Sequence, residues 1–138
     1  MDFIFERKIY YYETDKMGIL HHSNYIRFLE EARCKMLEQF EMPYSSFESN
    51  GIMIPVLGVN CSFKHHVTFN DIILIEPYVK QFNGVRLTMG YSITNKKTGN
   101  IVLTGETKHC FTDTSLKPIR LQNHIPEFYD KFIKLQNN

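Results

Sequence analysis

The sequence predicts a single α+β domain in which one long helix packs against an antiparallel sheet of about five strands. From Asn24 to Phe40, apolar residues recur at spacings of three and four, which is the period of an α-helix. From Leu57 to Phe111 the dominant period becomes two, and the turns are short enough that neighbouring strands must run antiparallel. No repeat, linker or low-complexity run divides the chain, so we expect residues 1–138 to form one domain.

The N-terminal third leads from a strand through a loop into the long helix. Residues 3–12 are rich in aromatic residues and isoleucine with interleaved charges, which is typical of a strand with one solvent-exposed face. Ser23 and Asn24 carry short oxygen-bearing side chains suited to capping the helix start. Arg33 falls within the apolar arc, where an unpaired charge is costly, so we expect it to reach an acidic side chain or the surface. The expected apolar arc consists of Tyr25, Phe28, Leu29, Ala32, Met36, Leu37 and Phe40.

Four strands and a terminal helix are expected in the rest of the chain. The segment around Pro77 is apolar on both faces, which predicts a central strand, and the proline predicts a break or bulge within it. The pair Asn83–Gly84 is a strong hairpin signal. In the terminal helix, Phe128 and Phe132 are expected to face inward. The expected irregular segment spans 41–54, the strands span 57–69, 72–82, 85–94 and 101–111, and the helix spans 126–135.

Composition and charge exclude several classes of function. The net charge of +1 lacks the clustered excess of lysine and arginine that nucleic-acid binding usually requires. Cys34, Cys61 and Cys110 are odd in number and form no CxxC pair, so we expect neither a disulfide framework nor a metal site. This cysteine usage fits a reducing, cytoplasmic location. We expect no signal peptide and no membrane span, because the apolar runs are too short for either.

The candidate site lies where the first loop meets the long helix. Asp15 belongs to the loop, and His22 follows seven residues later at the expected helix start. A helix start presents unpaired N–H groups and the positive end of the helix dipole. A carboxylate beside such donors is suited to acyl transfer, since the donors stabilise the oxyanion that forms during the reaction.

The residues around this junction also resemble a known family. The element order, with a sheet that curls around one long helix, resembles the hotdog fold. The motif resembles the signature of the acyl-CoA thioesterases typified by 4-hydroxybenzoyl-CoA thioesterase and the YbgC-type enzymes. The resemblance covers most of the chain in element order, whereas the specific motif spans only the first quarter. The motif consists of Tyr12-Glu13-Thr14-Asp15, Gly18-Ile19, His22-Ser23-Asn24-Tyr25 and Phe28-Leu29-Glu30-Glu31-Ala32-Arg33.

This resemblance implies hydrolysis of an acyl-coenzyme A thioester to a free acid and coenzyme A, with no metal and no separate cofactor. Asp15 matches the family's nucleophile or general base, and His22 matches the residue whose backbone N–H polarises the carbonyl. Such a donor stabilises the oxyanion by about 3–4 kcal/mol. An acyl-aspartyl anhydride and a water molecule activated by Asp15 are both consistent with these residues.

Six further residues are candidates for substrate binding. Tyr12, Gly18 and Tyr25 belong to the motif, although the spacing of Tyr25 also fits a core position. Lys64 and His65, together with the next residue, His66, are candidates for the phosphates of coenzyme A, against the simpler interpretation of a solvated strand end. His65 and His66 are neighbours in an expected strand, so their side chains should point to opposite faces and should not share a metal.

The resemblance also implies a homodimer or homotetramer, with the site between two subunits and part of the acyl pocket drawn from residues 56–67. An uncovered sheet edge favours the same expectation. Two alternatives remain open from the sequence: a thioesterase acting on acyl-carrier-protein substrates, and a non-catalytic module that binds acyl thioesters. Hotdog dehydratases use another arrangement of His and acid, so we do not expect dehydration. The length and aromatic or aliphatic character of the acyl group stay undetermined.

Overall fold

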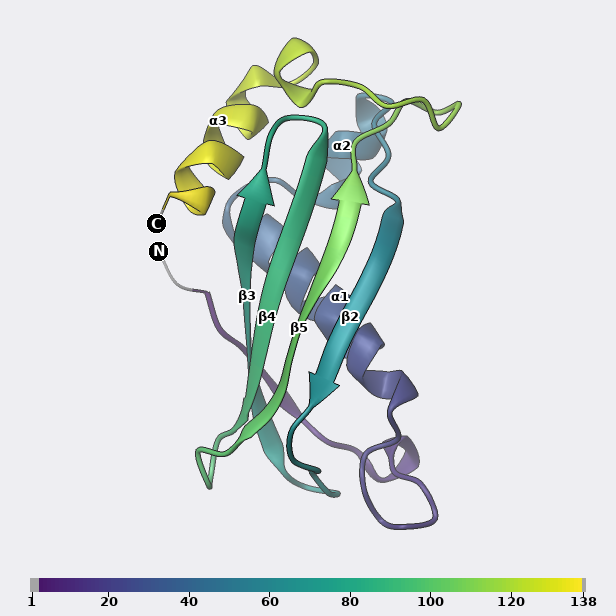
Figure 1. Cartoon of the computed structure of the whole chain (residues 1–138), viewed down its shortest axis with the longest axis vertical. Helices are drawn as coiled ribbons and strands as arrows, with labels where there is room; N and C mark the ends of the chain where they lie inside the picture. The colour runs from purple at the N-terminus through teal and green to yellow at the C-terminus, as the bar shows by residue number, and fades with distance from the viewer. Residues whose placement is uncertain (1–2, 138) are drawn as a thin grey trace.

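The protein folds as one antiparallel sheet curled around one long helix. The structure, a computed structural model, describes residues 3–137. The five strands pair antiparallel in the order β1-β3-β4-β5-β2, and Figure 1 shows α1 running behind this sheet. The predicted α+β class and sheet are confirmed. The elements are β1 (Phe5–Lys8), η1 (Tyr11–Glu13), α1 (Ser23–Gln39), α2 (Tyr44–Ser49), β2 (Val56–Phe63), β3 (Ile72–Phe82), β4 (Arg86–Asn95), β5 (Ile101–Cys110), η2 (Leu121–Asn123) and α3 (Pro126–Gln136).

The core lies between α1 and the inner face of the sheet. The apolar arc predicted for the helix is confirmed, because every member except the half-buried Phe40 is buried. The sheet contributes alternating buried residues from its middle strands, as a strand with one covered face requires. Burial of this apolar surface is the main favourable term in folding, at about 25 cal/mol per Å². The buried side chains of β3 and β4 include Ile73, Ile75, Val79, Leu87, Met89, Tyr91 and Ile93.

An aromatic cluster closes the end of the domain opposite the start of α1, where Figure 1 shows α2 and α3 together. Phe128 and Phe132 of α3 are buried, as predicted. The ring of Phe132 lies 4.9 Å from that of Phe82, and the ring of Phe128 lies 5.0 Å from that of Phe47 on α2. This end is therefore filled by rings, and the start of α1 is left at the other end.

The prediction for Arg33 is wrong, because its side chain reaches neither an acid nor the surface. The residue is buried on α1, and its guanidinium donates to the hydroxyl of Tyr44 at 3.0 Å and to the hydroxyl of Tyr91 at 3.0 Å. Two neutral oxygens thus satisfy part of the guanidinium, which keeps its charge in any surroundings. The Tyr91 hydroxyl also bonds Thr107, so α1 is joined to β4 and β5 by polar contacts.

Two strands are shorter than the sequence predicts. β1 covers only Phe5–Lys8, since residues 11–13 turn into the 3₁₀-helix η1. β2 ends at Phe63 instead of continuing to residue 69. The N–H groups of Lys64 and His65 both donate to the carbonyl of Val102, at 2.8 and 3.3 Å, and two donors on one acceptor end the regular ladder.

β3 is not broken at Pro77, and its irregularity lies between Val79 and Gln81. The carbonyl of Ile72 accepts the N–H of Lys96, directly after β4. Because backbone groups alternate in direction along a strand, the nitrogen of Pro77 faces the opposite side of β3, away from β4. β1 pairs there only with residues 72–75, so the missing N–H of the proline interrupts no ladder. β3 lies between β1 and β4, as predicted for a central strand, but beyond residue 75 it pairs with β4 alone. Within residues 3–137, no helix combines the length and apolar character needed to cross a membrane.

Candidate active site

Asp15 lies in a hairpin formed by residues 14–20, hereafter the Asp15 hairpin. Thr14 pairs with Leu20, the N–H of Asp15 donates to the carbonyl of Ile19 at 2.8 Å, and Gly18 makes the return turn at a φ of +79°. Glycine adopts this left-handed conformation without a steric penalty. The carboxylate oxygen Oδ1 of Asp15 accepts the N–H of Met17 at 2.8 Å. The side chain of Asp15 is therefore oriented by its own turn.

The start of α1 leaves one backbone donor free. The N–H of His21 donates to the carbonyl of Glu13, that of Ser23 to the ring of His21, and that of Asn24 to the carbonyl of His21. Tyr25 donates weakly to the carbonyl of His22, at 3.3 Å. The N–H of His22 has no acceptor among residues 3–137, and it is the donor that the sequence predicts to polarise the substrate carbonyl.

The expected capping roles of Ser23 and Asn24 are wrong. The Ser23 hydroxyl bonds the Nδ1 atom of His21 at 2.8 Å, and the amide of Asn24 donates to the carbonyl of Glu13 at 2.9 Å. Both residues are already helical, so their side chains point to the preceding loop rather than to the first turn. The imidazole of His21 accepts the N–H of Ser23 instead.

A cavity of about 340 Å³ opens beside the helix start. It brings together predicted site residues from two distant parts of the chain: His22 and Tyr25 at the start of α1, and residues 64–66 in the segment after β2. Asp15, Tyr12 and Gly18 do not line it, although Ile19, the backbone partner of Asp15, does. The cavity is lined by Ile19, Leu20, His22, Tyr25, Phe63, Lys64, His65 and His66.

Three of these lining residues were not predicted as site residues: Ile19, Leu20 and Phe63. Ile19 is part of the motif, so its position there was a usable signal. Phe63 lies directly before Lys64 and is more than half exposed, but its pattern in the sequence is that of an ordinary strand residue. Only the approach of β2 to α1 brings it to the site.

Tyr25 serves both as a core residue and as a cavity wall. The side chain is buried, and its ring lies 5.3 Å from that of Phe63 across the gap between α1 and β2. Burial raises the pKa of Tyr25 to about 12, so its hydroxyl stays protonated at neutral pH. Tyr12, in contrast, is 79% exposed and stacks on Tyr10 at 5.9 Å between ring centroids.

The prediction that His65 and His66 point to opposite faces of a strand is wrong. β2 has already ended, so the alternation of a strand does not apply to them. Their rings lie 5.1 Å apart and nearly parallel, and both residues are exposed. Together with Lys64 they form a rim of adjacent basic side chains on the cavity, hereafter the basic rim (residues 64–66).

Comparison with known proteins places the chain in a family. Residues 11–132 match the thioesterase-like superfamily, and the chain belongs to it. A solved structure of a DHNA-CoA thioesterase from Staphylococcus aureus is similar with a TM-score of 0.91 and 30% identity, over 97% of this chain and 90% of that one. The predicted hotdog fold is confirmed by this likeness.

Two curated relatives extend the comparison. YneP of Bacillus subtilis is 28% identical over 130 residues, which is 94% of each chain. The acyl-CoA thioester hydrolase YbgC of Escherichia coli O6:H1 is 23% identical over 88 residues, covering 64% of this chain and 66% of that protein. The family predicted from the motif around Asp15 is thereby confirmed.

Proposed function

We propose that the protein is an acyl-CoA thioesterase, which hydrolyses an acyl-coenzyme A to a free acid and coenzyme A. The observation that carries this proposal is the free N–H at the start of α1, which belongs to His22, a residue that lines a cavity beside the Asp15 hairpin. Membership of the thioesterase-like superfamily supports it, as do the activities named for the YbgC relative and the S. aureus structure.

In the proposed reaction, the thioester carbonyl oxygen binds the N–H of His22 at the positive end of the α1 dipole. Negative charge develops on this oxygen as the tetrahedral intermediate forms, so the hydrogen bond strengthens in the transition state and lowers the barrier by about 3–4 kcal/mol. The imidazole of His22 need not react, because the donor is a backbone group. No metal or separate cofactor enters this scheme.

Asp15 supplies the attack by one of two routes. Its carboxylate either attacks the carbonyl carbon, expels the coenzyme A thiolate and leaves an anhydride that water then cleaves, or it removes a proton from the attacking water. Both routes need a carboxylate close to the helix start. In this proposal the Asp15 hairpin supplies that carboxylate. The carbonyl of Glu13 accepts the N–H of His21, and Asp15 follows Glu13 by only two residues.

The cavity wall suits the remainder of the substrate. Leu20, Tyr25 and Phe63 offer apolar surface for an acyl or pantetheine chain, and the basic rim offers donors for phosphate oxygens. Tyr12 and Gly18 lie outside the cavity of the single chain, so we propose that they contact the substrate only in the assembled oligomer.

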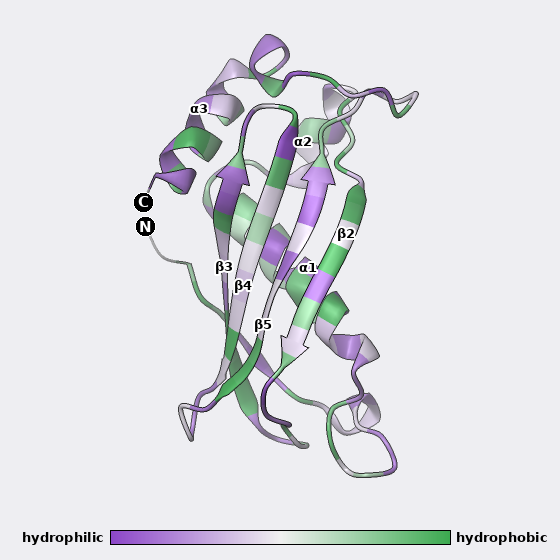
Figure 2. Ribbon diagram, in the orientation of Figure 1, coloured by the Kyte–Doolittle hydropathy of each residue, from purple (hydrophilic) through white to green (hydrophobic). Residues whose placement is uncertain are grey.

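We propose that the active unit is a homodimer, alone or within a homotetramer. β2 is an edge strand, and Figure 2 shows several hydrophobic residues along it. Val56, Leu57 and Val59 are 43–50% exposed in the single chain. Edge strands are usually protected by charged side chains or are covered by a helix or loop. The same strand ends at the cavity, so a second copy on this edge would complete the site.

The two alternatives keep the same site but change its use. A thioesterase for acyl-carrier-protein substrates would apply the same chemistry, with the basic rim meeting an acidic protein. A non-catalytic binding module would use the cavity without attack by Asp15. The three free cysteines, Cys34, Cys61 and Cys110, fit the cytoplasmic location that we propose for either activity.

Thiol release from short, medium, long and aromatic acyl-CoA thioesters tests the proposal. We expect release by the wild type and a loss of at least about 100-fold in kcat for Asp15→Asn, because the amide neither attacks nor accepts a proton. Asp113→Asn is a matched control, since Asp113 also accepts backbone N–H groups of its own turn but lies in the segment that follows β5, outside the Asp15 hairpin. Absence of release from every thioester by a folded protein would reject the enzyme and favour the binding module.

A further inference from the structure

Glu13 is a buried acid that the reaction does not use. It lies at the end of η1, two residues before Asp15, and is only 4% exposed. A buried carboxylate is costly unless it is paired and hydrogen-bonded. Its Oε1 atom accepts the guanidinium of Arg7 on β1 at 2.8 Å and the backbone N–H of Tyr10 at 2.9 Å. The side chain therefore has defined partners on the strand and the turn that precede the site.

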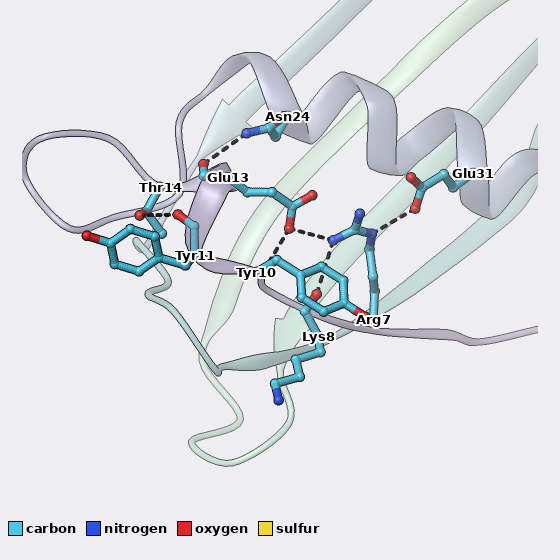
Figure 3. A network of polar contacts seen from close by, with 8 residues as sticks. All are labelled: Arg7, Lys8, Tyr10, Tyr11, Glu13, Thr14, Asn24 and Glu31. Atoms are coloured by element: carbon cyan, nitrogen blue, oxygen red, sulfur yellow. Dashed lines mark hydrogen bonds and ion pairs between the residues drawn. The ribbon is translucent and has the colours of Figure 1, made fainter.

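The backbone of Glu13 is bound to the start of α1. Its carbonyl accepts the N–H of His21 and the side-chain amide of Asn24, both at 2.9 Å. These two donors flank His22, which carries the free N–H. Glu13 thus contacts the strand through its side chain and the helix start through its carbonyl, and Figure 3 shows its contacts with Arg7, Tyr10 and Asn24.

Arg7 attaches this arrangement to the helix a second time. Its Nε donates to Glu31, two turns into α1, at 2.8 Å. Its guanidinium also lies 3.9 Å from the ring centroid of Phe28, a buried core residue of the same helix. The orientation of Glu13 is therefore set at two points along α1, through its carbonyl and through Arg7.

The Asp15 hairpin has few other attachments. Thr14 and Asp15 pair with Leu20 and Ile19 of the same hairpin, Thr14 also donates its N–H and its hydroxyl to the carbonyl of Tyr11 in η1, and the tip is exposed. The returning strand is held by backbone contacts with Val67 and Thr68. On its outgoing side, the hairpin is held to the helix start through Glu13.

We propose that Glu13 is a positioning residue for the thioesterase reaction, which sets the carboxylate of Asp15 at a fixed separation from the N–H of His22. The inference rests on the proposed function. Misplacement of a reacting group by about 1 Å costs about 100-fold in rate, so a defined separation has a direct kinetic consequence. Glu13 itself touches neither substrate nor reacting atoms.

The test compares Glu13→Gln with Glu6→Gln, both assayed well below the unfolding temperature. Glu6 lies on the same strand as Arg7 and pairs with Lys96 at the surface, so this control also replaces one paired carboxylate by an amide. We expect kcat of Glu13→Gln to fall by about 10- to 100-fold while KM changes by less than about twofold. We expect Glu6→Gln to match the wild type in both constants.

A third variant and a hydrogen-exchange measurement complete the test. Glu31→Gln removes only the outer contact of Arg7 at a half-exposed carboxylate, and we expect a kcat loss smaller than that of Glu13→Gln, about threefold or more. Hydrogen exchange at His21 and residues 14–20 should accelerate in Glu13→Gln but not in Glu6→Gln.

Unchanged kcat in both Glu13→Gln and Glu31→Gln, or unchanged hydrogen exchange at His21 and the hairpin, would overturn the positioning role. Equal losses in Glu6→Gln would also overturn it, because they would indicate a general effect of strand charges. A wild type that hydrolyses no thioester would reject the proposed function, and the exchange measurement would then decide the positioning role by itself.

Discussion

The chemistry proposed for His22 resides in a backbone atom, which makes the side chain and the N–H separable by mutation. His22 has a φ of −58°, close to the value fixed by a proline ring, and its N–H makes no contact that the described fold requires. Proline is well accommodated at the start of a helix for the same reason. The position therefore allows the donor to be removed without removing the helix.

We predict that His22→Pro lowers kcat by about 100- to 1,000-fold, the usual loss of one oxyanion donor. His22→Ala keeps the N–H and should retain kcat within about tenfold. Thiol-release kinetics on both variants, with circular dichroism to confirm the helix, make the comparison. A greater loss in His22→Ala than in His22→Pro would assign the catalytic role to the imidazole instead.

At the scale of the element, β2 is the strand whose surroundings the single chain leaves incomplete. It pairs with β5 on one side only, and its inward-facing Val59 lies beside the buried Thr107 yet remains 43% exposed. A charge at such a place is tolerated by a monomer but is costly inside a subunit interface. A measurement of the oligomeric state therefore tests whether a second copy of the chain covers β2.

We predict that Val59→Lys converts the proposed homodimer or homotetramer into a monomer and lowers thioesterase activity with it. Light scattering coupled to size-exclusion chromatography measures the mass, and the activity is assayed at the same concentrations. Thr104→Lys adds the same charge on an exposed residue of the neighbouring strand β5 and should leave the mass unchanged. A monomeric wild type with full activity would contradict the proposed assembly.

At the scale of the whole molecule, a buried polar chain joins α1 to the sheet. It runs from Arg33 through the hydroxyls of Tyr91 and Thr107 to the Nε2 atom of His109, with oxygen–nitrogen and oxygen–oxygen distances of 2.7–3.0 Å. His109 is 1% exposed, and its Nδ1 atom has no partner among the described residues. Burial, and then the charge of Arg33, lower the pKa of His109 to about 4.

We predict that the protein loses stability as the pH falls from about 6.5 to about 4. In this interval the unfolded chain binds a proton on His109 and the folded chain does not, so the free energy of unfolding decreases by up to about 3 kcal/mol. Urea denaturation at several pH values measures this dependence. His109→Gln should flatten it, whereas replacing the exposed His124 by Gln should not. An equally steep dependence in His109→Gln would contradict the assignment.

What the sequence alone determined is local in character. The apolar arc of α1, the alternation along β4, and the turn that orients Asp15 all depend on residues within one element or one turn. Helical periodicity and turn chemistry act over such short distances, so they can be recognised in the sequence without knowing which surface each element packs against. The motif around Asp15 added the family and the roles expected for Asp15 and His22.

Only the tertiary structure decided which distant residues meet. Lys64 and His65 line the same cavity as Tyr25 because β2 ends at Phe63, and that end depends on the carbonyl of Val102 in another strand. Arg33 finds its partner 58 residues away on β4, although its position in the helix indicated only that a partner was needed. Sheet register and curvature choose such pairs, and local propensity carries no information about either.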